Sequence, residues 1–266
     1  MQLDNPREFY YGLPLVTRVW VTVALIATIG SALGLVSLEY IRLDWESVIG
    51  RVHLWRLLTH AAFLGKIGIA FLFNVFWLIK HSQQLENSPY PPAGGHGKGT
   101  TADYAWMIIL CIFMLAGVNG LIVLLGLGGI APKWLAAWAL GRGSLMGEAL
   151  LSAMIWVWSR RFPEEPTGVW MIKTRGFYLP WLILGFNLLM GGDPTPGVVG
   201  YFVGAVFVLL VDTLPNAAPD QWGALAGKNV MHTPGFMYSL IDWAEARPAA
   251  PVARGGFAGV GRTLNG

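Results

Sequence analysis

Six apolar stretches alternate with polar segments along this chain, and this pattern decides the class of protein. Each stretch approaches or exceeds the roughly 20 residues that a helix needs to cross a bilayer. Hydrophobic residues make up 55% of the chain and charged residues only 12%, so a soluble core poorly explains all six stretches. We therefore predict an all-α membrane protein with six transmembrane helices. The stretches are Val19–Val36, Leu57–Ile79, Ala105–Ala131, Gly143–Ser159, Gly176–Gly192 and Pro194–Val211.

The distribution of Lys and Arg predicts how these helices are oriented. If both termini face the cytosol, 12 of the 18 basic residues lie in cytosolic segments and 6 on the other side. Basic residues are enriched in cytosolic loops, so both termini are predicted to be cytosolic. The net charge of +3 then reflects these loops, and no nucleic-acid partner is expected. The 12 are Arg7, Arg18, Lys80, Lys98, Arg160, Arg161, Lys173, Arg175, Lys228, Arg247, Arg254 and Arg262.

The same pattern divides the chain into three parts. Residues 1–215 are predicted to form the membrane domain, and residues 216–246 a cytosolic segment on the membrane surface. Thr233 and Pro234 are a typical N-cap and first helical residue, so a short helix should begin there and lie on the cytosolic surface of the membrane. Residues 247–266 are rich in Pro, Ala and Gly and are predicted to be disordered.

Two loops and one cysteine limit the possible chemistry. The loop Leu38–Arg56 has mixed charge, and its aromatic rings are expected at the level of the lipid headgroups. The loop Gln83–Thr101 has three prolines and a glycine-rich run, which indicates a flexible turn. Its lone His96 reads more simply as a solvated loop residue than as a metal ligand, so no metal site is predicted. Cys111 is the single cysteine, which excludes an internal disulfide.

An ordered set of short motifs between Tyr10 and Pro215 resembles the Derlin family, and Thr233-Pro234 matches beyond it. No single motif is specific, but the collinear set is. The resemblance implies a rhomboid-like helical bundle in the membrane of the endoplasmic reticulum. It also implies a pseudoprotease that helps to extract misfolded proteins for degradation. The matching segments are Pro14–Arg18, Leu54–Thr59, Phe71–Asn74, Leu85-Glu86, Val157–Pro163, Tyr178–Trp181 and Gly200–Gly204.

The residues needed for rhomboid proteolysis are missing from the expected positions. That chemistry requires a serine on the fourth span and a histidine on the sixth. The resemblance places the nucleophile near Gly147 and the base near Gly197, so no catalytic residue and no cofactor are predicted. Ser144 and Ser152 remain as hydroxyls, which should bond to their own helix backbone. The five histidines all lie outside the sixth stretch: His53, His60, His81, His96 and His232.

Two pairs of residues are candidates for structural or membrane roles. Gly200 and Gly204 lie on one helix face and should let the sixth span approach the fourth closely. Trp55 and Arg56 lie at the foot of the first loop, where the simple reading is an interfacial anchor. The family resemblance implies more, namely that this pair fixes the loop in the outer leaflet and helps to distort nearby lipid.

Polar residues within the spans mark a candidate cavity. Asn74 and Glu148 are predicted to line it, with a solvated position of Glu148 at the rim of the fourth span as the alternative. Many Derlins carry a neutral polar residue where Glu148 stands, and a histidine where Ala205 stands. The stretches Gly143–Ser159 and Gly176–Gly192 have 17 residues each, or about 26 Å of helix, which should encourage local thinning of the bilayer.

The tail predicts a partner. Phe257, Gly259, Gly261 and Leu264 match the F-x-G-x-G-x-x-L pattern of an SHP box, which recruits the hexameric ATPase called valosin-containing protein. Glycines let an extended backbone approach a sheet edge, while the two large side chains fill pockets. A chance match in a chain with 34 glycines is the alternative.

The combined hypothesis is a non-catalytic membrane adaptor that assists the retrotranslocation of misfolded proteins from the endoplasmic reticulum. Misfolded substrates, membrane lipids, the ATPase and a ubiquitin ligase complex are the expected partners, and the protein could form homo- or hetero-oligomers. An active rhomboid-type protease that uses Ser144 or Ser152 is the main alternative. A small-solute transporter is a third, but the repeated halves with midplane charges that such proteins often show are not seen here.

Overall fold

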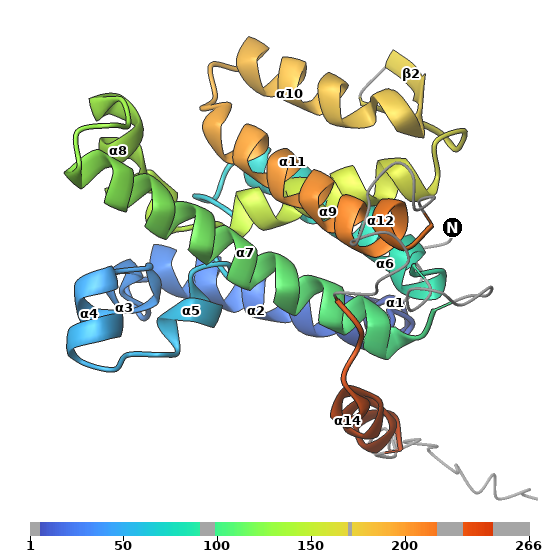
Figure 1. Ribbon diagram of the computed structural model, residues 1–266. Coiled ribbons are helices and arrows are strands. Elements are labelled where there is room, and N and C mark those ends of the chain that lie inside the picture. Colours follow the sequence, from blue (N-terminus) through green and yellow to red (C-terminus); the bar gives the residue numbers. More distant parts are fainter. Residues whose placement is uncertain (1–5, 91–98, 170–171, 217–230, 247–266) are drawn as a thin grey trace, which may run out of the picture.

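The computed structural model describes residues 6–90, 99–169, 172–216 and 231–246, and these residues are mostly helical (Figure 1). The helices are α1 (Pro6–Tyr11), α2 (Leu15–Ala32), α3 (Leu38–Ile41), α4 (Trp45–Gly50), α5 (Arg56–Thr59), α6 (Ile69–Asn87), α7 (Thr101–Leu127), α8 (Lys133–Leu140), α9 (Gly147–Arg161), α10 (Leu179–Leu189), α11 (Thr195–Val208), α12 (Leu214–Asn216) and α14 (Gly235–Glu245). Single turns of other helix types are Arg142–Ser144, Gly176–Tyr178 and Leu209–Thr213.

Three helical segments in the described ranges are long and apolar enough to cross a membrane. They are Leu15–Ala32, Thr101–Leu127 and Thr195–Asn216, and the last joins α11, a π-helical turn and α12. A fourth, Gly176–Leu189, is apolar but shorter. Each of the four overlaps one predicted stretch, while α6 and α9 overlap the other two. The mostly helical membrane class is therefore supported, and the count of six spans stays a prediction.

The predicted second stretch, Leu57–Ile79, is not one helix. α5 ends at Thr59 and α6 begins only at Ile69, so an irregular loop separates them. This loop packs on the start of α9, where the N–H of Met146 donates to the carbonyl oxygen of His60 at 2.7 Å. Irregular backbone is tolerated beside apolar helices where protein groups supply its hydrogen bonds.

α6 also continues past the predicted end at Ile79 and reaches Asn87. The apolar pattern stops earlier because the last turns of this helix bury polar side chains. Ser82 is fully buried and Glu86 is 4% exposed. Hydrophobic periodicity cannot predict such a helix end, because the buried side chains there are polar and hydrogen-bonded to other polar groups.

The structure contradicts the all-α prediction between α9 and α10. The segments β1 (Pro166–Val169) and β2 (Ile172–Arg175) pair as an antiparallel two-stranded sheet, with Val169 opposite Ile172. Pro163 follows the end of α9, where a proline cannot continue the helix, and β-branched residues then favour extended backbone. Strands of four residues are too short to show a period in the sequence.

α9 lies at the centre of the helices. It contacts α6, α7, α10 and α11, and the contact with α11 is the most extensive. The ring of Trp158 on α9 is fully buried, and its Nε1 donates to Oε1 of Gln84 on α6 at 3.0 Å. α7 runs diagonally across the molecule between α2 and α11 (Figure 1). The helices that frame α9 therefore fix its position on several sides.

Two glycines on α11 face α9. A methyl group at Gly200 would collide with the carbonyl oxygen of Ala149, and one at Gly204 would lie 2.7 Å from the carbonyl oxygen of Ala153. Glycine at these positions allows the two helix backbones to approach closely. α11 and α9 correspond to the predicted sixth and fourth spans, which are the two that this glycine pair was predicted to bring together.

The short helices gather at two opposite ends of the long ones (Figure 1). α3, α4, α5 and α8 lie at one end, which we call the α8 end. α1, α12 and α14 lie at the other, which we call the α1 end. The N-terminus of α2 and the C-terminus of α6 meet at the α1 end, where their polar groups are bonded to each other.

The C-terminal helix α14 packs on the start of α7. Met237 is buried against Ala102 and Ala105. The predicted N-cap role of Thr233 is wrong, because no side chain caps α14. The Thr233 hydroxyl donates to Oδ1 of Asp103 at 2.6 Å instead, since docking on α7 offers it a charged acceptor, which is stronger than a backbone partner.

Candidate functional site

A cavity of about 680 Å³ lies between α6, α9, α10 and α11. This volume falls in the range of sites that take up a drug-sized ligand or a comparable group. Aromatic and aliphatic side chains form most of the wall, among them Phe73, Trp77, Ile155 and Ile183. The polar and charged residues of the wall are Lys66, Asn74, Arg142, Glu148, Ser152, Asn187, Asp193 and Tyr201.

Glu148 lies in the first turn of α9 and lines the cavity. Its carboxylate lies against Gly65, where a methyl group would be 2.5 Å from Oε1. Gly65 has φ +102°, a conformation that side chains other than glycine rarely adopt. The positive end of the helix dipole favours a negative charge at this position of α9.

Asn74 lines the same cavity from α6. Its Nδ2 donates to the carbonyl oxygen of Leu64 at 3.2 Å. The bond holds the irregular loop between α5 and α6, which contains Gly65. Asn74 therefore both contributes an amide to the wall and supports the backbone that packs against Glu148.

An aromatic pair joins α6 to α10 beside the cavity. The rings of Phe73 and Phe186 meet edge to face, with centroids 5.8 Å apart and planes at 77°. The two helices make little other contact with each other. Aromatic pairs in this arrangement contribute only about 0.5–1.5 kcal/mol beyond their buried area, so α6 and α10 are weakly joined.

The serines near the expected catalytic position bond to their own backbone. Oγ of Ser152 donates to the carbonyl oxygen of Glu148 at 2.9 Å. Oγ of Ser144 donates to the carbonyl oxygen of Gly141 at 2.6 Å. Both bonds follow the pattern expected of helix and turn hydroxyls.

Three of the four described histidines contact groups outside the cavity. His53 stacks on Trp55 with centroids 4.4 Å apart, and Nδ1 of His60 donates to the carbonyl oxygen of Arg56 at 3.0 Å. His81 packs against the ring of Trp158. Within residues 6–90, 99–169, 172–216 and 231–246 no hydrogen bond joins a serine to a histidine.

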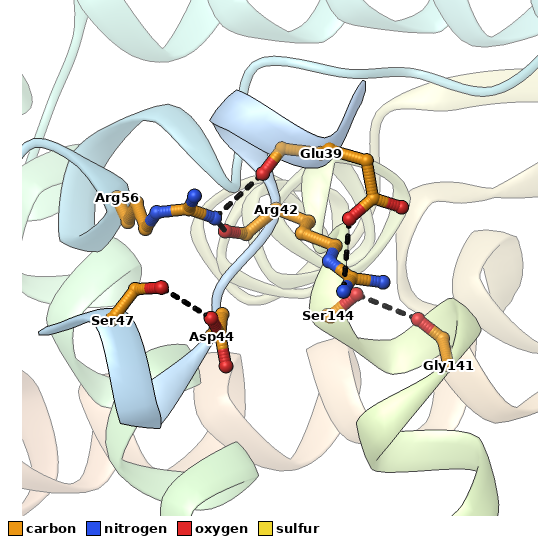
Figure 2. A network of polar contacts seen from close by, with 7 residues as sticks. All are labelled: Glu39, Arg42, Asp44, Ser47, Arg56, Gly141 and Ser144. Carbon is orange, nitrogen blue, oxygen red and sulfur yellow. Dashed lines mark hydrogen bonds and ion pairs between the residues drawn. The ribbon is translucent and has the colours of Figure 1, made fainter. Parts of the chain in front are cut away.

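Arg56 is the centre of the first loop at the α8 end, as Figure 2 shows. Its Nη1 donates to the carbonyl oxygens of Glu39 and Arg42 at 2.7 and 2.8 Å. These oxygens lie at the C-terminal side of α3, where carbonyl groups lack helical partners and attract a cation. Arg56 is only 7% exposed, whereas Trp55 is 49% exposed and stacks on His53.

A backbone hydrogen bond joins the first loop to the turn that precedes α9. The N–H of Leu43 donates to the carbonyl oxygen of Ser144 at 2.8 Å. Asp44 accepts a hydrogen bond from Ser47. That side-chain bond, with the charge of Arg56 as a smaller contribution, holds the pKa of Asp44 below its usual value.

Comparisons with known proteins show the family of this chain. A model of the Der1-like family matches residues 13–235. The chain belongs to the Der1-like family. It is 29% identical over 259 residues to Derlin-1 of Arabidopsis thaliana, a match covering 97% of this chain and 85% of that one. It is 29% identical over 255 residues to Derlin-2 of Oryza sativa subsp. japonica, covering 96% and 92%.

A similar match is found in a third organism. The chain is 28% identical over 239 residues to the probable derlin-2 homolog of Dictyostelium discoideum, covering 90% of this chain and 84% of that one. The resemblance that the ordered motifs indicated is therefore confirmed. The cavity of this Der1-like protein lies wholly within the matched residues. The four tail residues Phe257, Gly259, Gly261 and Leu264 lie outside the described residues.

Sequence reasoning missed three polar groups that hold the Der1-like protein together. Asn119 is the first. Its Nδ2 donates to the carbonyl oxygens of Ala139 and Gly143, both at 2.9 Å, and its Oδ1 accepts from Nε1 of Trp45 at 2.9 Å. It thus links α4, α7, α8 and the turn that follows α8. An asparagine within the apolar stretch Ala105–Ala131 was the signal that could have found it.

Asp193 is the second. It follows α10 and accepts hydrogen bonds from Nε1 of Trp138 at 3.1 Å and from the N–H of Thr195 at 2.9 Å. Arg142 lies 4.0 Å away. Burial raises the pKa of Asp193, but these hydrogen bonds and the charge of Arg142 outweigh burial and leave the pKa below its usual value.

Glu86 is the third, at the α1 end. Its carboxylate accepts from the N–H groups of Val16 and Thr17 at 2.8 and 2.7 Å and from the Thr17 hydroxyl at 2.7 Å. The hydroxyls of Thr17, Ser82 and Tyr104 continue the chain of hydrogen bonds. Glu86 on α6 therefore caps the N-terminus of α2, a role that a local sequence window cannot show.

Proposed function

We propose that this Der1-like protein is a non-catalytic, rhomboid-like membrane protein of the endoplasmic reticulum that assists the retrotranslocation of misfolded proteins for proteasomal degradation. The cavity between α6, α9, α10 and α11 carries the proposal. An amide, Asn74, and a carboxylate, Glu148, stand in a largely apolar wall, which suits a polypeptide segment with both apolar and polar groups. Ser152 lines the cavity too, but its hydroxyl is hydrogen-bonded to the backbone. This favours a cavity that binds a polypeptide segment over one that hydrolyses it.

The lengths of two helices support an effect on the surrounding lipid. α9 has 15 residues and α10 has 11, which correspond to about 22 and 16 Å of helix. Both are shorter than the ~30 Å hydrocarbon core, and such a mismatch favours local thinning of the bilayer. Thinner lipid lowers the cost of moving polar backbone across it, because each unsatisfied amide in hydrocarbon costs several kcal/mol.

The proposed topology has six spans with both termini in the cytosol. The 12 to 6 division of basic residues supports this orientation. It places the α8 end, with its first loop, on the luminal side. Trp55 is half exposed there and can contact lipid headgroups, while the buried Arg56 keeps the loop folded.

The tail is proposed to recruit the valosin-containing protein ATPase, which would pull the substrate into the cytosol, and a ubiquitin ligase complex would act beside it. Replacing both Phe257 and Leu264 with alanine should abolish co-purification of the ATPase. The double variant Arg254→Ala, Thr263→Ala is a matched control in the same segment. Undiminished recovery of the ATPase with the Phe257 and Leu264 variant would exclude this role of the tail.

The turnover of a misfolded membrane protein tests the central proposal. In cells that lack other Derlins, this protein should restore degradation, measured after synthesis is stopped. Ala70→Trp, which fills the cavity wall, should reduce the rate several-fold. Val19→Trp, on an exposed position of α2, is the control for tryptophan itself. Degradation that proceeds normally with Ala70→Trp would contradict a role of the cavity.

The alternative of an active protease is tested by two serine variants. Ser152→Ala and Ser144→Ala should restore degradation as well as the unaltered chain does, because both hydroxyls serve only their own backbone. The purified protein should also resist a serine-directed activity probe. Labelling that is lost in either variant would establish a protease.

A further inference from the structure

The charged residues of the cavity differ in whether they have partners. Asp193 is bonded to Trp138 and Thr195 and pairs with Arg142. Glu148, in contrast, makes no side-chain hydrogen bond or ion pair with any residue in the described ranges. The cavity therefore contains one carboxylate that is hydrogen-bonded to neighbouring groups, and one on which only the more distant charges of Arg142 and Asp193 act.

The surroundings of Glu148 keep its carboxylate in the wall. Its position in the first turn of α9 favours the negative charge. Behind it stands Gly65, where any side chain would collide with the carboxylate. A carboxylate among apolar walls loses part of its hydration, and a cation that enters the cavity would offset this loss.

Asn74 adds a second acceptor. Its Nδ2 is engaged with the carbonyl oxygen of Leu64, while its Oδ1 makes no hydrogen bond to the part of the chain that the structure describes. An ammonium or guanidinium group has several donors, so it can use the carboxylate of Glu148 together with an amide oxygen. The apolar wall beside them, with Phe73 and Trp77, suits the aliphatic stem of such a side chain.

We infer that the cavity selects membrane-inserted polypeptide segments that carry a lysine or arginine, and that Glu148 is the residue that recognises the cation. The inference rests on the proposed function and specifies the substrate class. A basic residue within an otherwise apolar segment is costly in lipid. It is therefore a chemical mark of a membrane segment that has failed to find its partner, and a carboxylate within the cavity can detect it.

Binding of model peptides to the full-length protein in lipid nanodiscs tests this. The probes are fluorescent Leu/Ala peptides of about 20 residues whose central residue is Lys, Arg, norleucine or Glu. The Lys and Arg peptides should bind at least about tenfold tighter than the norleucine peptide, the low end for a hydrogen bond to a charged group. Glu148→Gln should remove this difference, and Glu148→Lys should shift the preference to the Glu peptide.

Two matched variants serve as controls. Glu165→Gln removes an exposed carboxylate between α9 and β1 and should leave the preference unchanged. Lys66→Gln removes the cation next to Gly65 and should not abolish it. Thermal melting of every variant shows that the bundle is intact, and the charge reversal gives a readout that unfolding cannot produce.

Three results would contradict the inference: equal affinity for the Lys and norleucine peptides, a preference that persists in Glu148→Gln, or one that disappears in Lys66→Gln. If the norleucine peptide still binds and Ala70→Trp blocks it, the proposed function stands and only the selectivity is wrong. If no peptide binds, both the selectivity and the substrate role of the cavity fail.

Discussion

Two glutamates near the ends of neighbouring helices have opposite surroundings. Glu86, at the end of α6, accepts three hydrogen bonds from Val16 and Thr17 and is 4% exposed. Glu148, at the start of α9, borders the cavity and has no such partner within the described ranges. The two carboxylates are chemically identical, so the difference lies in what the fold places around them.

The comparison separates scaffold from site. A buried carboxylate whose oxygens are all engaged stabilises the fold and has nothing left to offer a ligand. A carboxylate held beside a cavity without partners contributes little to the fold, and its interaction is available for something that enters. The carboxylate at the α1 end thus serves the fold, and the carboxylate in the cavity is the one that is available to a ligand.

The largest expected effect comes from the close contact between α9 and α11, which fixes α9 next to the cavity. Gly200→Leu should lower the free energy of unfolding by about 3 kcal/mol or more, at the upper end of overpacking, because its side chain would collide with the backbone of α9. Thermal melting in detergent measures this. Gly117→Leu is the matched control, since that glycine lies on α7 with open space around it. Equal melting temperatures of the two variants would show that the close packing of α11 on α9 does not stabilise the protein.

The next effect tests the difference between Glu86 and Glu148 directly. Glu86→Ala should destabilise the protein by about 2–3 kcal/mol, because three donors at the start of α2 lose their acceptor. Glu148→Ala should change stability by less than about 0.5 kcal/mol, as expected for a residue without native partners. Glu46→Ala, at an exposed position of α4, controls for the loss of charge. Similar losses at Glu86 and Glu148 would show that both belong to the scaffold.

A smaller effect is expected where α14 docks. Asp103 accepts hydrogen bonds from Thr233 and Tyr238 at 2.6 and 2.7 Å. Thr233→Val should cost about 1 kcal/mol and speed hydrogen exchange within Gly235–Glu245. Ser239→Ala, on the exposed side of the same helix, should change neither. Unaltered exchange in Thr233→Val would mean that the packing of Met237 alone holds α14.

The smallest effect depends on pH. Because the folded pKa of Asp193 is depressed, its contribution to stability is complete above the pKa of the unfolded state and is lost as the pH falls through the folded value. The protein should therefore lose stability relative to Asp193→Asn below about pH 4. Melting temperatures of both proteins across this range measure the difference. Parallel curves would show that the carboxylate of Asp193 is not stabilised by its contacts with Trp138 and Thr195.

The fold could be predicted from the sequence where single helices carry the information. The apolar stretches located α2, α7 and α11, because a long apolar run has few alternatives to a membrane helix. The break between α5 and α6 could not be predicted, since the bond that permits it comes from Met146, far along the chain. The β1–β2 sheet was missed because strands of four residues leave no readable period.

The candidate site, too, could be predicted only in part from the sequence. Asn74 and Glu148 were found because polar residues within apolar stretches stand out in the sequence. Glu86 was recognised only as part of a motif, since its partners on α2 are 69 and 70 residues away. Whether a carboxylate such as Asp193 or Glu148 finds hydrogen-bond partners depends on tertiary contacts. The sequence alone could not predict this.

The docking of α14 has a consequence for how the protein matures. The donors of Thr233 and Tyr238 lie 130 and 135 residues after their acceptor, Asp103. During synthesis these two donors therefore leave the ribosome well over a hundred residues after Asp103. This contact therefore closes only after the helices between its two sides have been made, from α7 to α11.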